Sequence, residues 1–260
     1  MSQSLDQKLT TLKLGRMRQV YASWIEQAAH SELSYADFLE QLATEELLAR
    51  QENHLRRQMK AAGFPYPASI EQFDFSARPE LKRTVLLRFF DSSFITSSGC
   101  LLLIGPSGLG KTHLAVALGT KMVQLGYRVR FVLAQQVANA VLAVSSRTEL
   151  VHMIEPLIRC DLLILDEFGY LPIAPQVGPV LYEILAGRYE KGATVITSNK
   201  SLASWGEMIG DSALMMAILD RLLHHGEVFY LRGASFRMRG KEPVSLTPPK
   251  SASSSPSEPF

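Results

Sequence analysis

The residues with the clearest chemical potential lie in the stretch GPSGLGKT, which runs from Gly105 to Thr112 and satisfies the pattern G-x-x-x-x-G-K-[ST]. Glycines at this spacing let the backbone curl so that its N–H groups point inward at phosphate oxygens. The lysine side chain can then reach the β and γ phosphates, and the threonine hydroxyl can bind Mg²⁺. We therefore expect a nucleotide to be held by Gly105, Pro106, Ser107, Gly108, Leu109, Gly110, Lys111, Thr112 and His113.

A pair of acids follows the apolar run LLIL, at Asp166 and Glu167. An acid that ends a buried strand emerges at the carboxyl edge of the sheet, where ligands bind. Asp166 can hold Mg²⁺ there, so Thr112 and Asp166 are the expected metal residues, and Glu167 can polarise an attacking water. Two solvated acids at a strand end would look the same, but the nearby phosphate loop favours ATP hydrolysis.

Two further polar residues follow apolar segments. Asn199 ends the run ATVITSN and is expected to contact the γ phosphate or orient the attacking water, although an asparagine that starts a turn is a common alternative. Arg221 lies near the end of an apolar helix, where an arginine requires an anionic partner. That partner is either Asp220 or Asp211 of the same chain, or the γ phosphate of a neighbouring subunit.

The elements that must position these residues alternate between strand and helix patterns from residue 65 to 241. Near-continuous apolar runs separated by helical stretches predict a parallel sheet that is covered on both faces, and therefore an α/β fold. The predicted strands are residues 100–104, 127–132, 161–166, 193–198 and 227–231.

Residues 1–64 contain no strand-like run and predict a small, all-helical N-terminal domain that binds DNA or a partner. One helix is expected from Leu5 to Ala29. A second begins after Ser34, whose side chain can accept a hydrogen bond from the third helical amide, and ends at Gly63. Its last turns carry several cations, which either face nucleic acid or complement the negative end of the helix. The candidate DNA-binding residues are Arg50, Arg56, Arg57, Lys60 and, after the second strand, Arg147.

The remaining composition restricts the class of protein. The formal net charge is +2, too small to indicate nucleic acid by itself. Both cysteines lie in apolar runs, which argues against a disulfide framework, and we find no signal peptide and no transmembrane-length stretch. We expect a cytoplasmic protein with no membrane association, and a disordered Ser/Pro-rich tail over residues 242–260.

The glycine-rich loop, the Asp166-Glu167 pair, Asn199 and Arg221, in this order along the chain, resemble the AAA+ class of P-loop ATPases. The surrounding stretches GPSGLGKTHLAVALG, DLLILDEFGYLPI, RYEKGATVITSNKSLASWGEMIGD and AILDRLLHHGEVFYLRGASFRMR resemble the IstB insertion-sequence transposition helpers, and more distantly the helicase loader DnaC. That family commonly has G-E-S-Y-R where this chain has Gly233-Ala-Ser-Phe-Arg237, which removes a glutamate and a tyrosine hydroxyl. Arg237 remains as a sensor-like arginine that contacts nucleotide.

The resemblance implies an AAA+ P-loop NTPase with a five-stranded parallel sheet, which binds ATP and Mg²⁺ between subunits. Lys111, Glu167 and Asn199 would be catalytic within one subunit, and Arg221 would act from its neighbour. The implied protein assembles on duplex DNA into a ring or helical oligomer, hydrolyses ATP, and recruits an IstA-like partner transposase.

Two other functions are compatible with parts of the pattern. A replicative helicase loader of the DnaC type would use the N-terminal helices to bind a helicase. A small-molecule kinase is disfavoured because the chain lacks a lid-like insertion and carries the Asp166-Glu167 pair.

Overall fold

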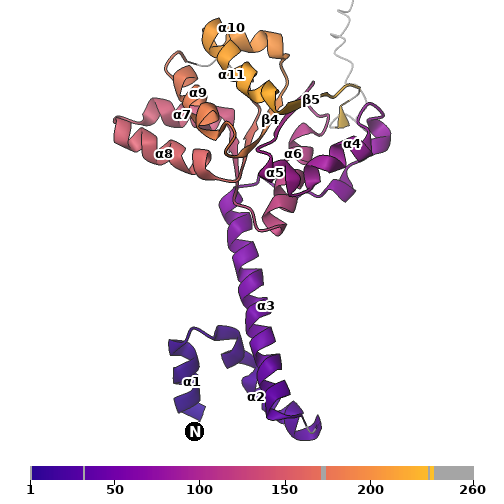
Figure 1. The fold of residues 1–260 in the computed structure, drawn as a ribbon, viewed down its shortest axis with the longest axis vertical. Coiled ribbons are helices and arrows are strands. Elements are labelled where there is room, and N and C mark those ends of the chain that lie inside the picture. The colour runs from indigo at the N-terminus through magenta and orange to yellow at the C-terminus, as the bar shows by residue number, and fades with distance from the viewer. Residues whose placement is uncertain (1, 32, 171–173, 234, 237–260) are drawn as a thin grey trace, which may run out of the picture.

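The computed structural model describes residues 2–31, 33–170, 174–233, 235 and 236. Its described part is elongated, with a sheet-containing body at one end, the helices α1 and α2 at the other, and the long helix α3 joining them (Figure 1). Arg237 and the predicted tail over residues 242–260 lie outside the described residues.

The first N-terminal region is two helices where the sequence predicted one. Helix α1 spans Ser2–Thr11 and α2 spans Gly15–Ser31. The prediction of a single helix from Leu5 to Ala29 is wrong because Lys13 adopts the left-handed conformation, with φ of 56°. The N–H of Leu14 donates to the Leu9 carbonyl and that of Lys13 to the Thr10 carbonyl, which is the Schellman pattern that ends a helix.

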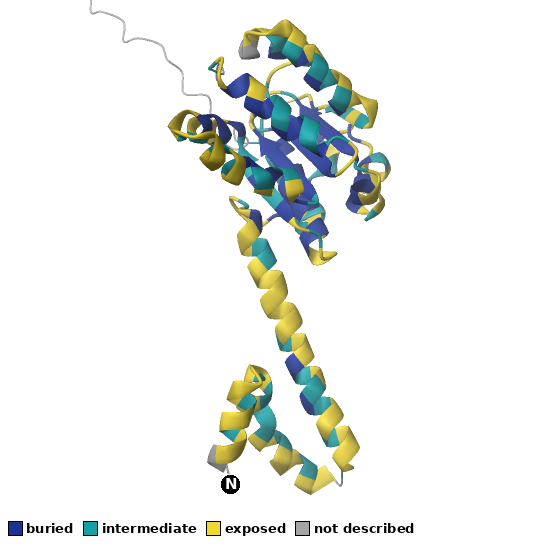
Figure 2. Cartoon of the chain, turned by 60° about the vertical axis from the view of Figure 1, so that its left-hand side comes forward, coloured by how far each residue is buried: buried dark blue, intermediate teal, exposed yellow. Residues whose placement is uncertain are grey.

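Helix α3, Tyr35–Ala62, begins and ends where the sequence predicted. The Ser34 hydroxyl accepts a hydrogen bond from the Asp37 N–H, and Gly63 takes the left-handed conformation at the other end. Most of the middle of α3 is exposed (Figure 2), and its last turns pack on the body through Met59 and Ala62. The helix therefore joins the N-terminal helices to the sheet.

The segment between α3 and the first strand consists of short helical turns that cover one edge of the body. It packs its phenylalanines, among them Phe73, Phe89 and Phe94, into the core beside the sheet. The elements are η1 Ile70–Gln72, η2 Phe75–Ala77, α4 Arg83–Leu87, η3 Arg88–Phe90 and α5 Ser93–Thr96.

The body contains the predicted five-stranded parallel sheet. Its strands lie in the order β2-β3-β4-β1-β5, and every neighbouring pair is parallel. They span β1 Cys100–Ile104, β2 Val129–Leu133, β3 Leu162–Asp166, β4 Ala193–Ser198 and β5 Gly226–Tyr230. Strand β4 therefore lies between β1, which precedes the glycine-rich loop, and β3, which carries Asp166.

Helices cover both faces of the sheet, as the uninterrupted apolar strands require. Leu101 and Leu103 of β1 face helix α6, Lys111–Gln124, whereas Leu102 and Ile104 face the opposite layer. That opposite layer contains α7 Ala134–Ala143, α8 Arg147–Arg159, α9 Val177–Arg188, η4 Leu202–Ser204, α10 Trp205–Ile209 and α11 Ser212–His224. Among the described helices, none has an apolar stretch of the length needed to span a membrane.

Candidate functional site

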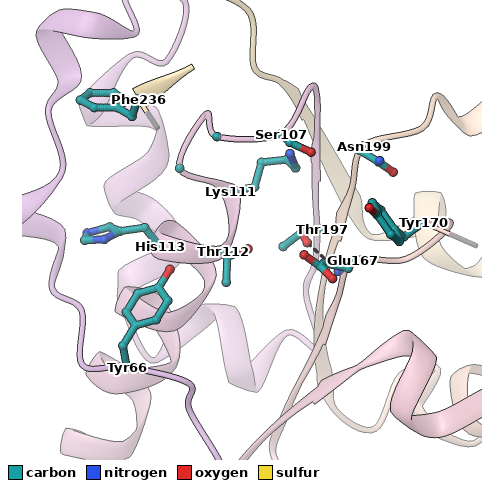
Figure 3. A pocket seen from close by; sticks show the side chains of 12 residues that line it. Tyr66, Ser107, Lys111, Thr112, His113, Glu167, Tyr170, Thr197, Asn199 and Phe236 are labelled. Atoms are coloured by element: carbon teal, nitrogen blue, oxygen red, sulfur yellow. Dashed lines mark hydrogen bonds between the residues drawn. The ribbon is translucent and has the colours of Figure 1, made fainter. Parts of the chain in front are cut away.

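A pocket opens at the carboxyl edge of the sheet, where the loops that follow β1, β3 and β4 meet (Figure 3). Because β4 lies between β1 and β3, residues at its tip stand between the glycine-rich loop and the acidic pair. Of the residues that the sequence predicted for the site, Lys111, Thr112, His113, Glu167 and Asn199 line this pocket together. Ser107, Gly108 and Gly110 of the loop also line it.

The glycine-rich loop folds around the lysine that ends it. The Lys111 ammonium donates to the carbonyls of Gly105 and Pro106, at 2.6 and 2.7 Å. Gly108 and Gly110 both have positive φ, and a Cβ at either one would collide with Ser235 or with the Phe73 ring. The curled backbone that the spacing predicts therefore depends on these glycines, and its concave side fits a chain of phosphates.

Asp166 is buried, with an exposed fraction of 2%, and contacts two residues that line the pocket, Thr112 and Thr197. Burial raises the pKa of its carboxyl group, while hydrogen bonds from Thr197 and Thr112 and the charge of Lys111 act in the opposite direction. The Thr112 hydroxyl lies 3.0 and 3.1 Å from the two carboxylate oxygens, and the Thr197 hydroxyl lies 2.5 Å from one of them. A desolvated carboxylate beside a threonine hydroxyl is an oxygen donor set that suits Mg²⁺. The residues present therefore fit the predicted metal site.

Glu167 follows Asp166 but faces the open pocket instead of the core. Its backbone is left-handed, with φ of 56°, which turns its exposed side chain away from the direction of β3. The Thr197 hydroxyl accepts a hydrogen bond from the Glu167 N–H at 3.1 Å and fixes this turn. A carboxylate that is solvated and aimed into the pocket is placed to accept a proton from water.

Asn199 lies at the tip of β4, and its buried side-chain oxygen has no hydrogen-bond partner among the described residues. A buried polar atom without a partner is costly, so a ligand or water in the pocket would complete the site. The residues beneath it are rigidly held. Ser198 donates to the Phe168 carbonyl and accepts a hydrogen bond from the Trp205 indole, and the Phe168 and Trp205 rings pack at 4.4 Å between centroids.

Arg221 lies away from this pocket, in α11. It lines a separate small cavity with Gly99 and Cys100, at the amino end of β1. Its guanidinium donates to the Ala217 carbonyl and lies 5.0 Å from the Tyr182 ring centroid. In the described part of the chain it forms no ion pair with Asp211 or Asp220, so neither of the expected partners within the chain is used.

None of the candidate DNA-binding residues lines the nucleotide pocket. Arg50 donates to Glu46 and to the Lys13 carbonyl, so it joins α3 to the turn between α1 and α2. Arg147 forms a two-bond ion pair with Glu183. Arg56, Arg57 and Lys60 are exposed. The first two line a groove with six other polar or charged residues, one of them acidic: Lys13, Arg16, Gln19, Glu46, Arg50 and Asn53.

Several residues that build the site were missed by sequence reasoning. Thr197 contacts both acids, and the two hydroxyl residues at the end of apolar β4 were the available signal. Arg78 is 2% exposed and donates to the Leu109 carbonyl of the loop, which no local pattern indicates. Tyr66, Tyr170 and Phe236 also line the pocket.

The sheet order, the loop between β1 and α6, and the polar residues at the tips of β3 and β4 define a P-loop fold of the AAA+ type. Solved structures of the same fold include DnaA from Aquifex aeolicus with AMPPCP, with a TM-score of 0.55 and 18% identity over 65% of this chain and 51% of that one. A DnaI structure has a TM-score of 0.55 and 19% identity, over 69% of this chain and 98% of that one.

Sequence comparison gives the family. Residues 7–243 match the family described as IstB-like ATP binding protein, and this chain belongs to that family. An ATP-binding protein of insertion sequence IS21 from Pseudomonas aeruginosa is 37% identical over 242 residues, which cover 93% of this chain and 91% of the relative. An ATP-binding protein of insertion sequence IS5376 from Geobacillus stearothermophilus is 35% identical over 230 residues, which cover 88% of this chain and 92% of the relative.

Proposed function

We propose that this chain is a transposition helper, an Mg²⁺-dependent ATPase that assembles on duplex DNA and recruits or stimulates a partner transposase. The observation that carries the proposal is the convergence of Lys111, Asp166, Glu167 and Asn199 on one pocket, in a chain whose relatives are insertion-sequence proteins.

Each side chain has a part in ATP hydrolysis that follows from its position. The Lys111 ammonium would exchange its two loop carbonyls for phosphate oxygens, because a charged acceptor binds it more strongly. Glu167 would take the proton of the attacking water, and the Asn199 amide would hold that water or a γ-phosphate oxygen. Thr112 and Asp166 would hold Mg²⁺, which when bound neutralises charge on the phosphates.

Duplex DNA is the proposed partner of the basic residues near the start of α2 and along α3. The lining of one groove brings Lys13, Arg16, Arg56 and Arg57 together from these two segments. Lysines and arginines gathered in this way suit a row of phosphates, so the binding should weaken steeply with salt and select little among sequences.

The place of Arg221 supports a second subunit. The nucleotide pocket of the same chain lies at the carboxyl edge of the sheet, whereas Arg221 lies beside the amino end of β1. We propose that it reaches the γ phosphate of a neighbouring chain, in a ring or helical oligomer.

The direct test measures ATP turnover by the full chain with and without duplex DNA. We expect DNA to raise the rate, Lys111→Ala to abolish nucleotide binding, and Glu167→Gln to bind ATP and DNA while losing turnover. A full chain that shows no DNA binding in ATP at low salt would contradict the proposal.

One observation favours a protein partner for the N-terminal helices instead. Tyr35, Leu39 and Leu47 of α3 are exposed, at 91%, 62% and 60%. Exposed apolar side chains suit a protein partner, and a helicase loader of the DnaC type would bind its helicase through these helices. Retention of a hexameric replicative helicase on the immobilised full chain would favour that function over the transposition helper.

A further inference from the structure

The nucleotide pocket has two chemically different ends. Glu167 and Asn199 lie on one side of the glycine-rich loop, and Tyr66, His113 and Phe236 lie on the other (Figure 3). A nucleotide whose terminal phosphate faces Glu167 must therefore direct its base toward the three aromatic rings. These rings have no part in the phosphate chemistry described above.

Phe236 is held against the loop from two sides. Its backbone N–H donates to the Gly108 carbonyl at 2.8 Å, which ties the segment after β5 to the phosphate loop. The guanidinium of Arg78 lies 5.1 Å from the Phe236 ring centroid, and the same buried arginine donates to the Ala77 carbonyl at 2.7 Å. A cation over an aromatic face stabilises the ring in place.

His113 lies on the same side of the loop and is held by the segment before β1. Its Nε2 lies 3.0 Å from the Ser69 carbonyl, and the Phe73 ring packs beside it with centroids 6.0 Å apart. Because a carbonyl only accepts, Nε2 must donate this hydrogen bond, which fixes the orientation of the imidazole.

Tyr66 is the most accessible of the three rings, with an exposed fraction of 43%. It lies between Pro65 and Pro67, just after the end of α3. A residue that precedes proline is restricted to extended backbone, so the backbone of Tyr66 is restricted before any ligand binds. A partly exposed aromatic ring that lines a pocket is suited to stacking on a flat heterocycle.

We propose that Tyr66, His113 and Phe236 form the subsite for the base of the nucleotide, with Tyr66 as the stacking residue. The inference rests on the proposed function in one respect, that the terminal phosphate faces Glu167. It gives Phe236 a binding role that needs only the face of its ring. It also assigns a binding role to Tyr66, which lies outside every motif of the chain.

The test compares a ligand that has a base with one that has none. Calorimetric titration of the full chain with Mg²⁺ would measure the Kd of a non-hydrolysable ATP analogue and of inorganic tripolyphosphate. Stacking on one aromatic ring changes affinity by roughly tenfold or more. We therefore expect Tyr66→Ala to raise the Kd of the ATP analogue about tenfold and to leave that of tripolyphosphate unchanged, while Tyr66→Phe binds both normally.

Tyr170 provides a matched control, because it is an exposed tyrosine at the other end of the same pocket. Tyr170→Ala should leave the ratio of the two dissociation constants at its normal value. An equal loss of both ligands in Tyr66→Ala, or no loss of either, would overturn the base subsite. A chain that fails to hydrolyse ATP or to bind DNA would refute the proposed function but would leave this ratio measurable.

Discussion

Thr197 serves both acids of the site with one hydroxyl group. It donates to Asp166 and accepts from the Glu167 N–H, and it is almost completely buried. The second contact holds Glu167 in a left-handed conformation that a side-chain-bearing residue rarely adopts. Thr197 is therefore a positioning residue for Glu167.

Replacing this hydroxyl tests that role. Thr197→Val keeps the shape but loses both hydrogen bonds, so we expect kcat to fall about 10- to 100-fold while KM for ATP changes little. Thr197→Ser should restore most of the rate because it keeps the hydroxyl. A Thr197→Val enzyme with normal kcat, or one in which only KM changes, would contradict the assignment.

The buried carboxylate of Asp166 should reduce the stability of the ligand-free protein. Its pKa is raised, chiefly by burial, so the folded state favours the neutral form. Between the usual pKa of 3.8 and the raised pKa, the carboxyl group is ionised in the unfolded state but still protonated in the folded state. The free energy of unfolding therefore falls as the pH rises through this range. Above that window the cost is fully present.

Asp166→Asn removes this charge and keeps the side-chain shape. In metal-free buffer at pH 8 we expect the variant to unfold at higher urea concentration, with a gain on the order of 1 kcal/mol. The gain should shrink as the pH is lowered through the raised pKa, and Glu167→Gln, at an exposed position, should show none. A variant that is less stable than the unchanged protein at every pH would refute this explanation.

Among the elements, α2 and α3 are joined by a buried carboxylate. Glu46 of α3 accepts hydrogen bonds from the N–H groups of Arg16 and Met17, in the first turn of α2, at 2.8 and 3.0 Å. Arg50 donates to its other oxygen at 2.9 Å. Burial alone would raise the pKa of Glu46, but the bonds from Arg50 and from the two N–H groups outweigh it and lower the pKa. The positive end of α2 is thus satisfied by α3.

Glu46→Gln should loosen the N-terminal helices. We expect a loss of about 1–3 kcal/mol in local stability, seen as faster amide exchange over residues 2–31. Because its pKa is lowered, Glu46 contributes stability above its usual value of 4.5 and loses it as the pH falls through the lowered pKa. Glu45→Gln is the control, since its ion pair with Arg16 is largely exposed and should contribute little. Equal exchange in both variants would contradict this account.

The same elements show how far the sequence predicts this fold. The strands, the phosphate loop and both ends of α3 follow from local patterns, because each depends on residues within a few positions of one another. The break at Lys13 was missed because a lysine occupies the position where glycine normally ends a helix. Thr197 and Arg78 were missed because their partners, Asp166 and Leu109, lie 31 residues away in each case.

At the scale of the whole molecule, the nucleotide pocket and Arg221 lie at opposite ends of the strands. The pocket is built on loops that leave the carboxyl ends of β1, β3 and β4, whereas Arg221 shares a cavity with Gly99 and Cys100 where β1 begins. No small movement within one chain would bring the guanidinium to a phosphate held by Lys111. If Arg221 acts in hydrolysis, a second copy of the chain must supply it.

Mixing two inactive variants distinguishes this arrangement from a purely structural role. Lys111→Ala chains cannot bind nucleotide but keep Arg221, and Arg221→Ala chains keep an intact pocket. Each variant alone should show little turnover, because every site lacks one of the two groups. In a mixture some Arg221→Ala pockets would face a neighbour that supplies the arginine, so we expect partial recovery of ATP hydrolysis that is greatest near equal amounts. A mixture no more active than the sum of its components, with assembly intact by light scattering, would exclude an arginine contributed by the neighbour.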